Sequence, residues 1–234
     1  MKLQQYALGM AAAVGMLVAG CSGLHSSEAT MVTYSLRSTA SAVGTAAGDG
    51  VNAVAVARPM AALQVLLPRA QPGLDTDRIA LAGADHRLDY FAASRWSDTL
   101  PLVVEAALVE SLRGGGRFVA VHDSVAPFHA DYVLQVDVRN FEAQYAGAAS
   151  IGGIAAASSA PTAVVRLECT LGRRLDRSLI STFVVESRIA ADANRVTAIV
   201  DALARASQSA LREVDAKADA AIATAQLPPT PLPR

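Results

Sequence analysis

The chain has 234 residues, enough for one large domain or two small ones. It carries 20 Lys and Arg against 21 Asp and Glu, a formal net charge of −1, which excludes nucleic-acid binding driven by bulk positive charge. Because 52% of the residues are hydrophobic and 18% are charged, the composition also excludes a disordered chain, and two cysteines cannot form a disulfide framework.

The first twenty residues have the pattern of a lipoprotein signal peptide. Lys2 precedes an apolar run over residues 6–19, which is shorter than the roughly 20 residues that a transmembrane helix needs. The run leads through small residues into Cys21 and resembles a bacterial lipobox, in which the cysteine is acylated and residues 1–20 are removed. Ser22 favours sorting to the outer membrane. An ordinary signal peptide with a chance cysteine is the alternative.

After a polar tether at 21–32, a single ordered domain is expected over residues 33–225. Residues 38–52 are rich in small residues without a usable period and predict a loop. The first half of the domain contains five short strand candidates: 33–36, 63–67, 77–83, 86–91 and 117–122.

Two helices are predicted. The first has Asp98 or Thr99 as its N-cap and Pro101 inside its first turn, and glycines at 114–116 end it. The second runs over residues 195–223 after a cap at Asp192 or Asn194. Its alanine-rich second half is expected to extend beyond the domain, and residues 226–234 form a Pro-rich flexible tail.

Three segments alternate apolar and polar residues, over 132–139, 165–171 and 182–186. A period of two with one polar face is typical of antiparallel sheet. Cys169 lies in the apolar half of its series and is interpreted as a buried, inert thiol. The predicted fold class is α/β, a three-layer domain with a mixed, largely antiparallel sheet packed by helices.

No catalytic or metal-binding constellation stands out. His122, Asp123 and Ser124 with His129 and Asp131 form the only polar cluster of interest, but neighbours on one loop do not readily align as nucleophile, base and orienting acid. The cluster is interpreted as a polar turn between strands. No catalytic residue, metal or cofactor is predicted.

Two loops could contact a lipid surface or a partner protein. Residues 146–160 form a long apolar loop with Ile151 and Ile154 at its tip, for which low complexity is the alternative interpretation. Three arginines crowd the next turn, where they could meet phosphates or acidic side chains or merely be solvated: Arg173, Arg174 and Arg177.

Several motifs, taken in order, resemble the ABC-type transport auxiliary lipoproteins, the PqiC-like partners of MCE-domain lipid transport systems. They comprise Tyr34-x-Leu36, Gly73-Leu74-Asp75-Thr76-Asp77-Arg78-Ile79-Ala80, Leu88-x-Tyr90, Arg95-Trp96-Ser97-Asp98-Thr99-Leu100-Pro101, Arg117-Phe118, Asp131-Tyr132-x-Leu134, Asn140-Phe141 and the alanine-rich terminal helix. The resemblance covers residues 33–212. Arg95 and Trp96 could belong to a partner interface, although a lone tryptophan most often anchors a core.

The resemblance implies a non-enzymatic subunit at the outer membrane, attached through acylated Cys21. Its partner would be a periplasmic MCE-domain protein and, through that protein, an ABC permease and ATPase that move phospholipid or related molecules. A homo-oligomer is a further expectation, and nucleic acid is not expected. Two other functions stay open: a lipoprotein that binds cell-wall or assembly components without a transporter, and a lipid-anchored hydrolase that uses the His122–Asp131 cluster.

Overall fold

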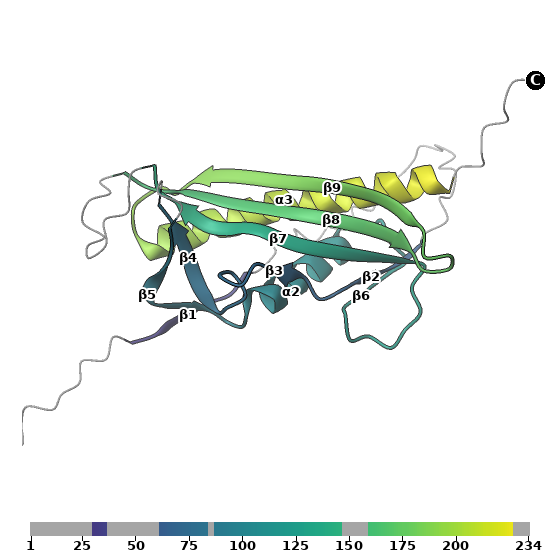
Figure 1. Ribbon diagram of the computed structural model, residues 1–234, viewed down its shortest axis with the longest axis horizontal. Coiled ribbons are helices and arrows are strands. Elements are labelled where there is room, and N and C mark those ends of the chain that lie inside the picture. Colours follow the sequence, from purple (N-terminus) through teal and green to yellow (C-terminus); the bar gives the residue numbers. More distant parts are fainter. Residues whose placement is uncertain (1–29, 37–60, 84–86, 147–158, 227–234) are drawn as a thin grey trace, which may run out of the picture. The chain divides into compact units, whose positions relative to one another are not determined.

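A computed structural model describes residues 30–36, 61–83, 87–146 and 159–226 (Figure 1). The chain divides into two compact units, Met1–Met31 and Val32–Arg234, and the elements described below belong to the second. They are β1 (Val32–Tyr34), β2 (Ala62–Val65), β3 (Arg69–Ala70), β4 (Arg78–Ala82), β5 (Leu88–Trp96), α2 (Leu100–Gly114), β6 (Ala120–His122), β7 (Tyr132–Gln144), β8 (Thr162–Arg173), β9 (Leu179–Ala190) and α3 (Val196–Ala225).

The nine strands form one mixed sheet centred on β7. The three longest strands, β7, β8 and β9, pair antiparallel over almost their whole length, as their alternating patterns predicted. The short strands β2, β3 and β4 pair parallel with β7, and β5 joins β4 antiparallel. The predicted α/β class and mixed sheet are therefore confirmed. The long, continuous strand pairings are antiparallel, and the parallel pairings involve only short strands.

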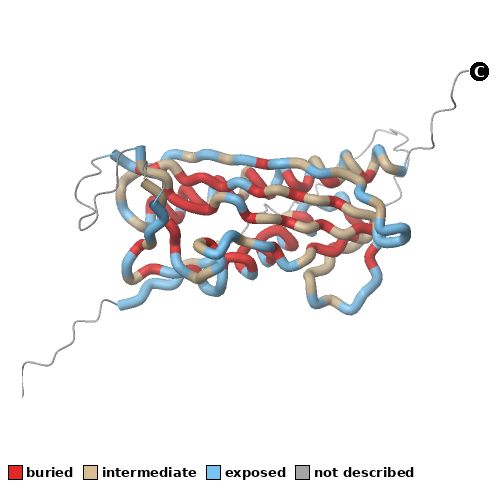
Figure 2. Tube along the Cα trace, in the orientation of Figure 1, coloured by how far each residue is buried: buried red, intermediate tan, exposed pale blue. Residues whose placement is uncertain are grey.

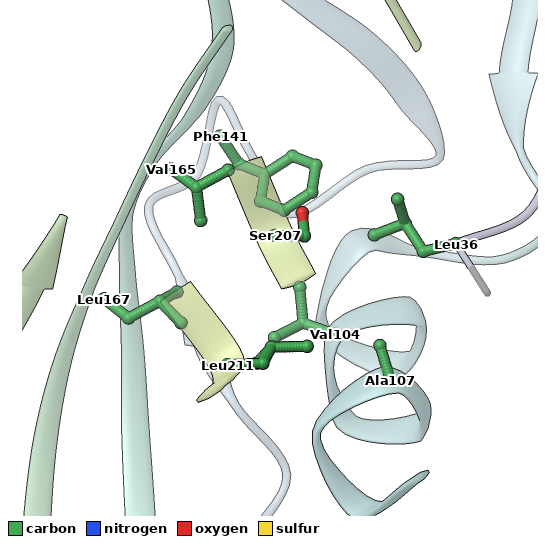
Figure 3. Close-up of a pocket in the computed structure, with 8 residues that line it drawn as sticks. All are labelled: Leu36, Val104, Ala107, Phe141, Val165, Leu167, Ser207 and Leu211. Atoms are coloured by element: carbon green, nitrogen blue, oxygen red, sulfur yellow. The ribbon is translucent and has the colours of Figure 1, made fainter. Parts of the chain in front are cut away.

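One face of the sheet forms the core with both helices. Tyr132, Leu134, Val136 and Val138 alternate with more exposed residues along β7 and are at most 5% exposed (Figure 2). The same face carries side chains of β7 and β8 that meet α2 and α3 (Figure 3). Sheet and helices thus supply two of the three expected layers, and no helix among the described residues covers the other face.

The long helix α3 packs against the sheet along its whole length, so the expectation that its second half extends beyond the domain was wrong. Ala218 is fully buried and Ile222 is 5% exposed. The reason is a match of lengths: 30 residues of helix span about 45 Å, and the 13 residues of β7 span about 43 Å. The sheet is long enough to cover the alanine-rich turns.

The predicted caps of α3 were also wrong. Arg195 occupies the N-cap position without a side-chain hydrogen bond. Asn194 Oδ1 instead accepts a hydrogen bond from the Tyr145 hydroxyl at 2.8 Å, and Asp192 pairs with Arg205 at 3.2 Å. At α2, Thr99 is the N-cap position, likewise without a side-chain cap bond, and Pro101 lies in the first turn as predicted.

Candidate docking surfaces

Three motifs of the family resemblance, residues 73–78, 88–90 and 95–101, meet where β4, β5 and α2 join. The Tyr90 hydroxyl donates to the Gly73 carbonyl at 2.8 Å, and the Arg78 guanidinium lies 4.0 Å above the Tyr90 ring. Two backbone bonds then fix the next segment: Trp96 N–H donates to Asp77 O at 2.7 Å, and Leu100 N–H donates to Thr76 O at 3.0 Å. The motif residues therefore hold the start of α2 in place.

Trp96 and Arg95 have different environments. Trp96 is 1% exposed and meets Phe141 edge-on at 5.7 Å, so it is a core residue. Arg95 is half exposed; its guanidinium lies 3.8 Å from the Asp77 carboxylate and 3.5 Å from the Thr33 hydroxyl. Arg95 thus ties β1 to the sheet while leaving part of its surface accessible. The other predicted site residues, Cys21, Ile151 and Ile154, lie outside the described residues, and their roles stay predictions.

The core holds a small void between the helices and the sheet, shown in Figure 3. Its volume is about 10 Å³, and its wall is formed by Leu36, Val104, Ala107, Phe141, Val165, Leu167, Ser207 and Leu211. The Ser207 hydroxyl donates to Leu203 O within its own helix at 2.7 Å. A space of this size accommodates about one water molecule, so it is a packing gap that cannot hold a lipid chain.

The open face of the sheet carries charges that neutralise one another across the strands. Arg139 pairs with Glu168 at 2.7 Å, and both Arg166 and Arg188 pair with Glu186, at 3.2 and 2.6 Å. Arg69 on β3 likewise pairs with Asp137 at 2.8 Å. Exposed pairs of this kind contribute roughly 0–1 kcal/mol each, and they leave this face with little unpaired charge.

A cleft of about 480 Å³ lies beside Gly73 and Tyr145. Its lining includes Glu142, which is 4% exposed. The carboxylate accepts hydrogen bonds from Asn140 Nδ2, Gln144 Nε2 and the Phe141 backbone N–H, at 2.8, 2.9 and 2.7 Å. All three donors belong to this chain, so the hydrogen bonds of the Glu142 carboxylate are satisfied within the fold and its role is structural.

The opposite end of β7 carries a surface that the sequence patterns indicated only in part. We call residues 123–131, before β7, and residues 173–179, at the β8–β9 turn, the distal tip. The backbone N–H of Arg174 donates to Asp131 O at 2.9 Å. The Arg174 guanidinium also donates to the Gln64 side chain, whose amide donates to Asp123 O at 3.3 Å. These bonds join the two segments through β2.

The distal tip exposes large apolar side chains. Leu175 is 93% exposed, Val125 is 86% exposed, and Phe128 and Leu179 are each 66% exposed. A cleft of about 360 Å³ lies beside Leu175 and is also lined by Tyr132. Isolated exposed leucines are ordinary, but several in two adjoining segments are typical of an interaction surface. In the sequence, this surface is indicated by Leu175, which lies between the charged residues Arg174 and Asp176 of a turn.

Arg177 at the same turn has a left-handed backbone, with φ of +57°. That conformation disfavours most residues with a Cβ and suits Gly or Asn. Asp176 holds the turn closed: hydrogen bonds from the Ser178 hydroxyl and backbone lower the pKa of its carboxyl. The turn therefore presents a guanidinium at a position where the backbone alone favours a smaller residue.

The His122–Asp131 cluster makes local structural contacts. The Asp131 carboxylate accepts from Ala62 N–H at 2.8 Å, and the Asp123 carboxylate accepts from Val125 N–H at 3.2 Å. The Ser124 N–H donates to Glu105 Oε1 at 2.7 Å, and the His122 ring lies against the Phe128 ring. Within the described part of the chain, no group of three or more His, Cys, Asp or Glu side chains could hold a metal ion.

Cys169 is fully buried on β8, as its alternating series predicted. Burial raises the pKa of its thiol to about 12. A protonated thiol without solvent access is a poor nucleophile and metal ligand. The interpretation as an inert core residue is confirmed.

Two solved structures have a similar fold. XCC0632 of Xanthomonas campestris, described as a DUF330 protein, is 22% identical, with a TM-score of 0.61 over 71% of this chain and 87% of that one. A second crystal structure, of an uncharacterized protein, is 14% identical, with a TM-score of 0.57 over 80% and 98% of the two chains. These similarities establish the fold. No curated protein matches the chain.

No helix in the described ranges is sufficiently long and apolar to span a membrane. The family model for the ABC-type transport auxiliary lipoprotein component matches residues 34–215, well over half of the chain. The chain therefore belongs to the ABC-type transport auxiliary lipoprotein family.

Proposed function

We propose that this protein is an outer-membrane lipoprotein that docks a periplasmic MCE-domain subunit of an ABC system for lipid transport. The family match over residues 34–215 carries the proposal. The lipobox-like sequence ending at Cys21 supplies the attachment, since several buried acyl chains make desorption from a bilayer negligible.

The arrangement of polar groups also favours docking over catalysis. The Asp123 and Asp131 carboxylates of the His122–Asp131 cluster accept hydrogen bonds from nearby backbone, and Cys169 is buried and protonated. The core void holds about one water molecule. The domain therefore acts through its surface. A tether raises the local concentration of that surface near an envelope partner without any new contact.

Affinity purification of the full-length, lipidated protein from its own cells tests this proposal. After mild chemical crosslinking, an MCE-domain subunit is expected among the co-purified proteins, with the lipoprotein in the outer-membrane fraction. A matched Cys21→Ala variant is expected to lose the membrane fractionation. Recovery of cell-wall or assembly proteins without an MCE-domain subunit would instead support a lipoprotein that works without a transporter.

A further inference from the structure

The distal tip lies far from β1, the first strand of the domain. Val32 pairs with Ser94 on β5, and Arg95 pairs with Arg78 on β4. The β4 register on β7 places Arg78 level with residue 140, eight residues from Tyr132 at the tip. At about 3.3 Å per residue, this separation is roughly 26 Å.

The direction of β1 places its first residue still farther from the tip. β1 runs parallel to β5, β5 runs antiparallel to β4, and β4 runs parallel to β7. Val32 is therefore the end of β1 that lies farther from the tip, and Figure 1 shows β1 and the β8–β9 turn at opposite ends of the sheet. In a domain attached through the chain that precedes β1, the distal tip is the far end.

The charge of the distal tip argues against two of its potential partners. The tip has three arginines, Arg173, Arg174 and Arg177, and three aspartates, Asp123, Asp131 and Asp176, so its formal charge is balanced. Attraction to an anionic membrane surface typically needs about four to eight basic residues. A symmetric contact centred on the β8–β9 turn would bring Arg174 and Arg177 close to their own copies across the two-fold axis.

The local pairing of these charges defines the remaining partner. Arg173 pairs with Asp176 at 3.4 Å, whereas among the described residues neither Arg174 nor Arg177 has a carboxylate partner. Both are exposed; Arg174 directly precedes Leu175, and Arg177 follows it by two residues. Arginine and aromatic side chains, phenylalanine included, are enriched in the cores of protein interfaces, and arginine is among the residues that most often dominate the binding energy.

We infer that the distal tip is the docking surface for the partner subunit, and that the partner presents an apolar pocket bordered by carboxylates. Leu175 and Phe128 fill the pocket, and the guanidinium groups of Arg174 and Arg177 pair with the carboxylates. The left-handed backbone of Arg177 is a local strain of the kind that occurs at binding sites. This inference rests on the proposed function, because it assigns the MCE-domain subunit to this surface.

Site-specific photocrosslinking in living cells tests the inference. The photoreactive residue p-benzoylphenylalanine is placed at position 175 of the full-length protein, and at position 88 as the matched control. Leu88 is also an exposed leucine, but it pairs with Ala82, which lies level with Gln144 at the other end of β7. An adduct with the MCE-domain subunit is expected at position 175 and not at position 88.

The other outcomes separate this inference from the proposed function. If an MCE-domain subunit co-purifies but is crosslinked only at position 88, or at neither position, the distal tip is not the docking surface. The proposed function then still stands. If position 175 forms adducts only with lipid or with a second copy of the protein, the assignment of partner docking to the distal tip is also wrong. Absence of the subunit from both adducts and co-purified material contradicts the proposed function itself.

A pair of substitutions measures the contribution of the tip. Leu175→Glu and Arg177→Asn are each expected to lower the yield of co-purified MCE-domain subunit by about tenfold, as expected for losing a central interface residue. Leu88→Glu should leave it unchanged. Arg177→Asn relieves the left-handed strain, so the melting temperature should stay the same or rise while docking falls. Full docking by both tip variants would overturn the inference.

Discussion

Replacing Gly115 by alanine tests the contact between the end of α2 and α3. Gly115 has a right-handed backbone, with φ of −68°, so alanine fits its conformation. An added Cβ would, however, overlap Asp215 Oδ2 and lie 3.0 Å from Asp215 Cγ. Asp215 is 7% exposed, and Oδ2 also accepts from Arg117 Nε at 3.0 Å. The methyl group must therefore displace a buried carboxylate from its arginine partner.

Two opposing contributions set the magnitude. Loss of a charged hydrogen bond costs about 1.5–3 kcal/mol, and the lower end applies because the Arg117 side chain is 44% exposed. Glycine to alanine at a compatible backbone gains about 0.4–1 kcal/mol. The net expectation for Gly115→Ala is a destabilisation of about 1 kcal/mol.

A double-mutant cycle isolates this contact. Unfolding in urea is followed by the fluorescence of Trp96, the one tryptophan of the chain, which is buried. In an Asp215→Ala background the clash is absent, so Gly115→Ala should become stabilising by about 0.4–1 kcal/mol. An equal effect of Gly115→Ala in both backgrounds would refute the reasoning.

Three further predictions concern Ile222, Cys169 and Asp215. Ile222→Ala should destabilise the domain by about 2–4 kcal/mol in the same urea assay, because α3 packs to its last turns; a loss below about 0.5 kcal/mol would contradict this. The Cys169 thiol should resist maleimide at pH 8 in the native protein and react completely in denaturant, because burial raises its pKa to about 12; stoichiometric native labelling would disprove its burial. Burial also raises the pKa of Asp215, so folding favours its protonated form. The stability advantage of the wild type over Asp215→Asn should be greatest below the ordinary pKa of about 3.9 and decline as pH rises through the raised folded value. Urea unfolding between pH 4 and pH 7 measures this, and an advantage that grows with pH would contradict it.

Much of the fold was predictable because the long strands carry a strong local signal. The alternation around Val136, Leu167 and Val185 identified β7, β8 and β9, and the buried residues are those in phase with the core face. The packing of the second half of α3 was predicted wrongly because Ala218 has high helix propensity in any environment. Only the length of the sheet determines that this alanine is buried, and that length is a tertiary property.

The candidate site was less predictable from the sequence. The sequence shows Arg174 and Arg177 as part of a crowded turn, but Phe128 lies in a different loop, and no local pattern links the two segments. The segments meet only because β7 and β8 pair antiparallel, with Tyr132 opposite Arg173. For Trp96 the sequence favoured a core position over a partner interface, and the structure places it in the core.

Complementation of a strain that lacks this gene tests the central claim most directly, with outer-membrane permeability as the readout. If the protein works as an anchored docking surface, a His122→Phe variant, which removes the imidazole of the His122–Asp131 cluster but keeps a ring against Phe128, should restore the barrier as fully as the wild type. Cys21→Ala and the Leu175→Glu, Arg177→Asn double variant should both fail, at equal protein levels. The opposite pattern, with His122→Phe inactive and the anchor and tip variants fully active, would contradict the account.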